Sequence, residues 1–208
     1  MNTSRIAAGT AVLVLVLTAC SGPQPQTTST ASVATASAPT ATPGPIPTAT
    51  SKENERGQLI QKIGEAVTLY TNGYDAPPTL TFKVTSIKPI KCDAPSATPP
   101  KGTAIAVALE IATSPTFSGP PQENGQAGRI SFHPSYWRGY APSGTPMNTV
   151  KSSVQHDCLA DTTTLLPDSF GKGEKLTGLV ILDVTTPTGE VAFEPYGGGG
   201  WVWKYPAT

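Results

Sequence analysis

Charged side chains are scarce in this sequence, and the two signs are balanced. They make up 13% of the 208 residues, and 14 Lys and Arg stand against 14 Asp and Glu. A protein that binds nucleic acid presents a surplus of cations to the phosphates, so this composition gives no reason to expect nucleic acid as a partner. Gly and Pro are abundant instead, at 20 and 22 residues, which predicts many turns and few long helices.

Side chains that bind transition metals are also few. The sequence contains two His, three Cys and two Met, one of which is Met1. Copper carriers cluster such ligands, whereas His133 and His156 are not expected to pair here, and Met147 stands alone. We therefore expect no metal ion and no other cofactor.

The N-terminal apolar run is too short to cross a membrane. It extends from Ile6 to Leu17 and follows a single positive charge at Arg5. A transmembrane helix needs about 20 apolar residues, whereas this run has the length of the apolar region of a signal peptide.

The apolar run ends in Leu17-Thr18-Ala19-Cys20, which resembles the lipobox of bacterial lipoproteins. In that family a peptidase cuts directly before the cysteine, whose sulfur carries a diacylglycerol. The resemblance implies that residues 1–19 are a signal peptide and that Cys20 anchors the protein to the outer face of the cell membrane. The alternative is an ordinary secreted protein with a chance cysteine at this position.

The cysteine count supports this interpretation. Three cysteines are an odd number, which is unusual for an exported protein. If Cys20 carries lipid, Cys92 and Cys158 remain as a pair, and thiols outside the cytoplasm most often form a disulfide. We therefore predict a bond between Cys92 and Cys158.

Residues 20–51 are expected to form a disordered tether. From Ser21 to Thr50 the chain contains no charged and no aromatic residue and consists mainly of Thr, Ala, Ser and Pro. Such a segment cannot bury enough apolar surface to offset the entropy of ordering. The composition also suits an O-glycosylated stalk, and a bare spacer is an equal alternative.

Residues 52–208 carry the pattern of an all-β domain. Apolar residues alternate along 80–84, 105–111 and 176–184, as in strands with one buried face, and a final strand is expected at 201–205. With turn signals between them, these segments predict an antiparallel, immunoglobulin-like sandwich of seven or eight strands.

Smaller features of this domain leave alternatives open. Leu59, Ile60 and Ile63 have helical spacing, so a short lead-in helix is one expectation, and residues 65–70 could form the first strand. The strand that starts at Leu80 is expected to reach Cys92 with a bulge near Ser86. Ser152 to Asp161 could hold a helix, and Met147 to Val150 could return antiparallel to the strand before it.

Several short patterns in this region occur in the order seen in a known family. They are Ile63-Gly64-Glu65, Lys101-Gly102-Thr103, Ser131-Phe132-His133-Pro134-Ser135-Tyr136-Trp137, Leu166-Pro167 and the strand that follows Gly173. Together they resemble the telokin-like, immunoglobulin-like domain of many Gram-positive lipoproteins, a domain of unknown function. The mycobacterial immunoprotective extracellular protein family is a related fold group. The resemblance implies a sandwich over about residues 63–205, and it supplies no catalytic residues.

The triplet His156-Asp157-Cys158 comes nearest to a reactive site. A Cys–His pair can make a nucleophile, and these three side chain types can bind zinc. Adjacent residues on a strand point to opposite faces, and a disulfide at Cys158 would remove the thiolate. We therefore do not expect catalysis or zinc binding at the triplet.

Aromatic side chains offer a candidate binding face. Trp201, Trp203 and Tyr205 alternate along one face of the last strand, and Trp137 lies on another aromatic segment. If exposed, they could stack on sugars or receive a partner protein. If buried, they would form the core, which is the more frequent outcome for Trp on a sandwich strand.

These observations favour a lipid-anchored, extracytoplasmic module that binds an unknown envelope protein or glycan and is not an enzyme. One alternative is a lipoprotein that binds a small ligand or glycan. A second, less favoured alternative is a hydrolase of unrecognised type.

Overall fold

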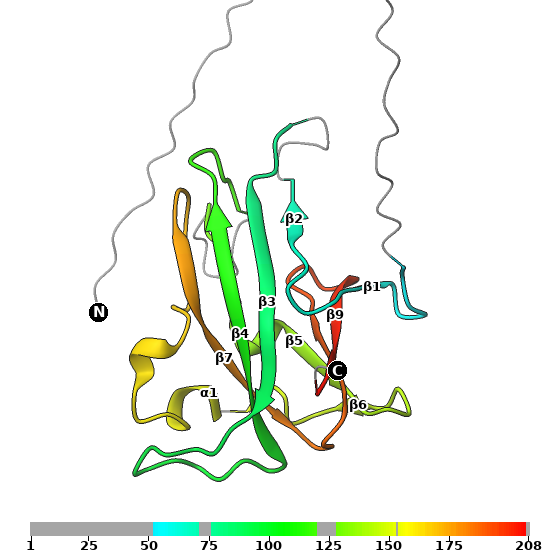
Figure 1. The fold of residues 1–208 in the computed structure, drawn as a ribbon, viewed down its shortest axis with the longest axis vertical. Helices are drawn as coiled ribbons and strands as arrows, with labels where there is room; N and C mark the ends of the chain where they lie inside the picture. Colours follow the sequence, from blue (N-terminus) through cyan, green and yellow to red (C-terminus); the bar gives the residue numbers. More distant parts are fainter. Residues whose placement is uncertain (1–51, 71–75, 120–127, 153, 207–208) are drawn as a thin grey trace, which may run out of the picture. The chain divides into compact units, whose positions relative to one another are not determined.

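Two β-sheets form the folded part of the computed structural model, which describes residues 52–70, 76–119, 128–152 and 154–206 (Figure 1). The first sheet has the order β2-β3-β4-β7, with β2 at Val67–Leu69, β3 at Leu80–Pro89, β4 at Thr103–Thr113 and β7 at Lys175–Val184. The second sheet has the order β1-β9-β8-β5-β6, with β1 at Gln58–Ile60, β9 at Gly200–Tyr205, β8 at Gly189–Phe193, β5 at Trp137–Tyr140 and β6 at Pro146–Met147. The predicted all-β sandwich is confirmed, and the described residues form nine strands.

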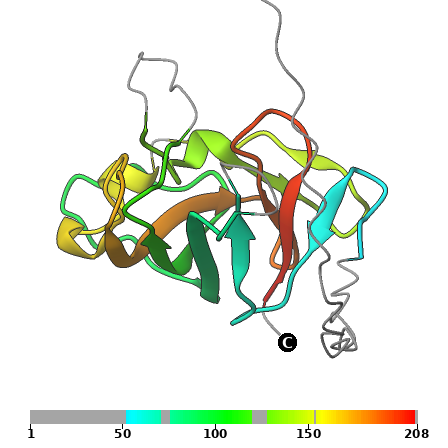
Figure 2. The ribbon, with the colours of Figure 1, turned by 90° about the horizontal axis from the view of Figure 1, so that it is seen from above.

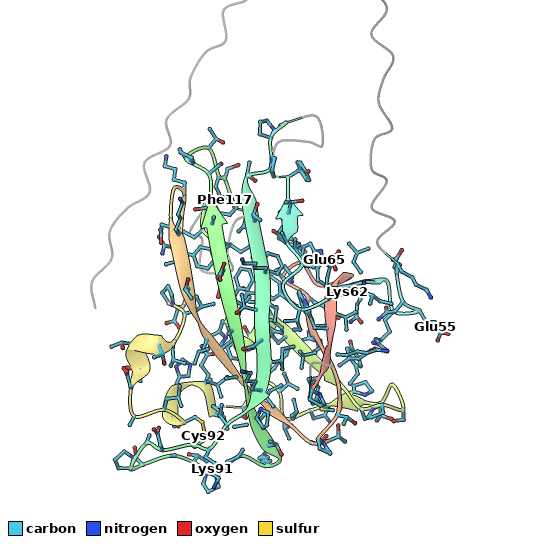
Figure 3. The ribbon with its side chains drawn as sticks, in the orientation of Figure 1. Glu55, Lys62, Glu65, Lys91, Cys92 and Phe117 are labelled. Carbon is cyan, nitrogen blue, oxygen red and sulfur yellow. A yellow bond between two sulfur atoms is a disulfide. The ribbon has the colours of Figure 1, made fainter. Side chains whose placement is uncertain are left out.

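The core lies between the inner faces of these sheets, and the long strands β3, β4 and β7 supply much of it (Figures 1 and 2). Figure 3 places Phe117 and Cys92 near opposite ends of these strands. Strand β4 pairs antiparallel with both β3 and β7, and residue Leu109 faces Val84 on one side and Gly178 on the other. Because side chains alternate along each strand, one apolar face of β3, β4 and β7 points into this layer.

A bulge keeps β3 in phase with this core. Leu80, Phe82 and Val84 are buried at every second position, and then the register with β4 shifts between Val84 and Ser86. The extra residue restores the burial of Ile87, which would otherwise point to the outer face. The bulge predicted near Ser86 is confirmed, although β3 ends at Pro89 and does not reach Cys92.

The expected lead-in helix is wrong, because Gln58–Ile60 form strand β1. This strand runs parallel to β9, with Gln58 opposite Gly200, so the sandwich is not wholly antiparallel. Asn54 turns the chain into β1: its Oδ1 accepts the backbone N–H groups of Arg56 and Gln58, each at 3.0 Å. The free edge of β9 then supplies the backbone partners that a helix would have found within itself.

Three short helical segments complete the described fold. Helix α1 (Val154–Asp157) falls within the region where a helix was predicted, and the 3-10 segments η1 (Pro134–Tyr136) and η2 (Thr162–Thr164) flank it in sequence. Strand β2 lies within 65–70 as predicted, and β6 pairs antiparallel with β5. None of the helices in the described ranges is long and apolar enough to span a membrane. The predicted signal peptide (1–19), Cys20 and the tether (20–51) lie outside the described residues.

Candidate functional site

The aromatic residues considered as a possible binding face lie in the core or pack against it, which is the alternative that the sequence favoured. Trp137, Trp203 and Tyr205 are at most 4% exposed. Trp203 lies 6.0 Å from Trp137 between ring centroids. Trp201 is partly exposed, and its ring stands perpendicular to that of Phe82 at 5.4 Å. The three aromatic residues of β9 do share a face, but the sandwich turns that face inward.

A groove of about 580 Å³ opens where three chain segments meet beside β9. The turn at 141–144, the turn at 188–190 and the end of β9 at 204–206 line it, together with Arg56. Arg56 forms an ion pair with Glu190. Lys204 is exposed and takes part in none of the ion pairs found among the described residues. We call this surface the end groove, and it presents one unpaired ammonium group.

A polar network fixes Arg56 at the edge of the end groove. The guanidinium lies 4.0 Å from the centroid of the Tyr140 ring, and its Nε donates to Gln58 Oε1 at 3.0 Å. Gln58 is 1% exposed, and its Nε2 donates to the carboxylate of Glu194 at 2.5 Å. Burial, and then the neighbouring Glu194 carboxylate, raise the pKa of Tyr140, so this phenol stays protonated and donates to Glu194 at 3.3 Å. The segment that follows the predicted tether is thereby locked to the sheet.

The carboxylate of Asp183 gives part of the Lys101-Gly102-Thr103 pattern a structural role. Its carboxylate is fully buried and accepts the backbone N–H groups of Lys101 at 2.8 Å and Gly102 at 2.9 Å. A side chain at Gly102 would collide with the carbonyl of Val184, because a Cβ there would lie 2.2 Å from that oxygen. These contacts fix the position at which β4 begins. A structural role is therefore enough to account for Asp183 and Gly102.

The predicted disulfide between Cys92 and Cys158 is confirmed, with Cα atoms 4.3 Å apart (Figure 3). The carbonyl of Cys158 accepts the backbone N–H groups of Asp93 at 2.8 Å and Ala94 at 3.1 Å. Cys158 belongs to a second, smaller core on the outer face of the first sheet, where helix α1 covers Ala104, Ala106 and Ile181. The triplet His156-Asp157-Cys158 therefore has no free thiol.

The expectation that the two histidines do not pair is wrong. The ring centroids of His133 and His156 are 5.7 Å apart, with an interplanar angle of 33°. His133 precedes η1, and its Nδ1 accepts the backbone N–H of Ser135 at 3.2 Å. Burial, and then the charge of His156, lower the pKa of His133, while Asp168 acts in the opposite direction. The two residues are 23 positions apart in sequence, so no local pattern could have linked them.

Metal sites with three or more protein ligands are not found in the part of the chain that the structure describes. No group of three or more His, Cys, Asp and Glu side chains there is placed to hold an ion.

Comparison with known proteins adds a weak likeness of fold. No protein-family model matches the sequence, and no curated protein matches it. MPT63, a secreted protein of Mycobacterium tuberculosis, is 18% identical with a TM-score of 0.47 over 71% of this chain and 97% of that chain. A candidate lipoprotein of Bacillus subtilis is 11% identical with a TM-score of 0.37 over 62% of this chain, which spans only 37% of that protein.

Proposed function

We propose that this chain is a lipid-anchored, non-enzymatic binding module on the outer face of a bacterial cell membrane. The disulfide is the observation that carries the proposal. It uses Cys92 and Cys158, which leaves Cys20 as the remaining one of the three cysteines. Cys20 is also the cysteine that follows Leu17-Thr18-Ala19, where a lipoprotein peptidase would cut.

The state of Cys158 supports binding over catalysis. Its sulfur is bonded to Cys92 and the residue is fully buried, so it cannot supply the thiolate that a Cys–His nucleophile requires. Asp183 is likewise engaged by two backbone donors. The contacts of Cys158 and Asp183 therefore stabilise the fold.

Substitution of Cys20 by Ser should release the protein from the membrane or leave the precursor uncut. A Ser hydroxyl cannot form the thioether, and two acyl chains contribute about 0.8 kcal/mol per buried methylene to anchoring. Fractionation of cells, with mass spectrometry of the N-terminal peptide, measures both outcomes. The matched control is Cys92→Ser with Cys158→Ser, which should stay in the membrane fraction. A mature wild-type chain without lipid would contradict the anchor.

The end groove is the surface that we propose for ligand binding, and its occupant is an extended peptide segment of an envelope protein with an acidic side chain. Turns at 141–144 and 188–190 present backbone groups and the hydroxyls of Ser143 and Thr188. Lys204 offers an unpaired cation at the same place, which would meet a carboxylate. The network around Arg56 holds one wall in position before the ligand arrives, which lowers the cost of binding.

Replacement of Lys204 by Glu should abolish peptide binding at the end groove. The probes are a Gly/Ser-spaced acidic peptide, its Lys-containing counterpart and an N-acetylglucosamine tetramer, added to the full mature chain. Amide chemical shifts should move at 141–144, 188–190 and 204–206 with the acidic peptide alone. Lys172→Glu, at an exposed turn on the other sheet, makes the same change of charge and should bind normally. Shifts with the sugar alone would favour the glycan-binding alternative and overturn the peptide proposal.

A further inference from the structure

The distance between the two histidine rings matches the spacing of imidazoles that share one metal ion. A Zn–N bond is about 2.0–2.1 Å, so two imidazoles on one ion have centroids about 4.5–6.4 Å apart, depending on the angle at the metal. The rings of His133 and His156 are 5.7 Å apart. His156 is exposed and His133 is partly buried, so the space beside them is open to water.

Both histidines stand on supports that do not depend on an ion. His133 is followed by η1, and the next strand begins at Trp137, whose indole donates to the carbonyl of Phe132 at 3.0 Å. His156 lies two residues before Cys158, which the disulfide and the second core hold. Little conformational entropy would therefore be lost when an ion binds.

Ser135 suits His133 to act as a metal ligand through Nε2. A ligating histidine usually donates its other ring N–H to an oxygen, which orients the ring. The Nδ1 atom of His133 lies 3.0 Å from Ser135 Oγ. In the tautomer that binds a metal ion through Nε2, the ring proton is on Nδ1, which donates a hydrogen bond to this hydroxyl and no longer accepts the backbone N–H of Ser135.

Two carboxylates near the pair carry the charge opposite to that of a metal ion. Asp168 acts electrostatically on His133 and would offset the positive charge of an ion. Asp157 follows His156 on α1 and is partly exposed. Two neutral imidazoles with water in the remaining positions are a ligand set that suits Cu²⁺, Ni²⁺ and Zn²⁺, with Cu²⁺ bound most tightly.

We propose that His133 and His156 form a solvent-open site for a divalent transition-metal ion. The site holds Cu²⁺ more tightly than Zn²⁺. It is independent of the end groove and of lipid attachment.

The test is a titration of the full mature chain, without a polyhistidine tag, with Cu²⁺ and Zn²⁺. Electron paramagnetic resonance of the Cu²⁺ complex should show coupling to two nitrogens, and calorimetry should give one site. His156→Ala and His133→Ala should each weaken Cu²⁺ binding by about tenfold or more, since each removes a ligand. His133→Asn keeps an acceptor for the Ser135 N–H but has no Nε2, so it should weaken Cu²⁺ binding as much as His133→Ala does while the fold is retained.

Glu55→Gln provides the matched control. Glu55 is exposed and lies before β1, far along the chain from both histidines, so this variant should bind Cu²⁺ like the wild type. A wild-type spectrum with coupling to one nitrogen would overturn the site. Wild-type affinity in a double variant, His133→Ala with His156→Ala, would do so as well and would assign the binding to the chain terminus. Circular dichroism of each variant establishes that the fold is intact.

Discussion

Replacement of Phe82 by Ala is expected to lower the free energy of unfolding by about 3–5 kcal/mol. Phe82 is 1% exposed and lies at the centre of the sandwich. Its ring centroid is 5.0 Å from that of Phe132 and 5.8 Å from that of Phe193. It also lies 5.4 Å from Trp201 and 6.2 Å from Trp203. Truncation would leave a cavity among four rings, which are held by β8, β9 and the segment before η1 and cannot close in together.

Urea denaturation followed by tryptophan fluorescence measures this loss. Phe82→Leu keeps most of the volume and should cost less than about 2 kcal/mol, because apolar exchanges of similar size are better tolerated. Tyr196→Ala removes an aromatic ring that is 51% exposed and should change stability by no more than about 0.5 kcal/mol. Equal losses for Phe82→Ala and Tyr196→Ala would contradict the central position of Phe82.

Removal of the disulfide is the second change with a large expected effect. Cys92→Ala combined with Cys158→Ala should destabilise the domain by about 4 kcal/mol, because the bond closes a loop with a sequence separation of 66. The unfolded chain regains the entropy that this loop had lost. Since small domains are stable by about 5–15 kcal/mol, the double variant should unfold at much lower denaturant concentration.

Hydrogen exchange can localise the effect of the disulfide. Amides of 90–102 and 154–165 should lose protection first, because the bond joins these two segments over the outer face of β4 and β7. The wild type in a reducing agent should behave like the double variant. A loss below about 1 kcal/mol, or unchanged protection near Cys158, would show that the second core is stable without the bond.

The strands of the first sheet were predictable because their signal is local. Alternation along 105–111 and 176–184 depends only on a side-chain period of two, and even the bulge after Val84 follows from where that period breaks. Strand β1 was not predictable in this way. Its backbone partner is β9, which begins 142 positions after β1 does, and three apolar residues cannot distinguish a helix from a strand.

The aromatic residues of β9 show a second limit of prediction from the sequence. Alternation places Trp201, Trp203 and Tyr205 on one side of their strand, but it does not say whether that side meets a second sheet or solvent. Packing against β3 decided that they are core. The disulfide was inferred by counting thiols, and the structure then supplied the Cα separation of 4.3 Å that makes it possible.

By itself, the sequence determined the all-β class and the pairing of Cys92 with Cys158, and it predicts an export pattern that ends at Cys20, because each depends on composition or on neighbours along the chain. The tertiary structure alone decided that Trp137 and Trp203 are buried, that Arg56 and Lys204 line one groove, and that His133 lies beside His156. These outcomes depend on which strands and turns meet across the sandwich, and residues far apart in sequence become neighbours only when the sheets pack.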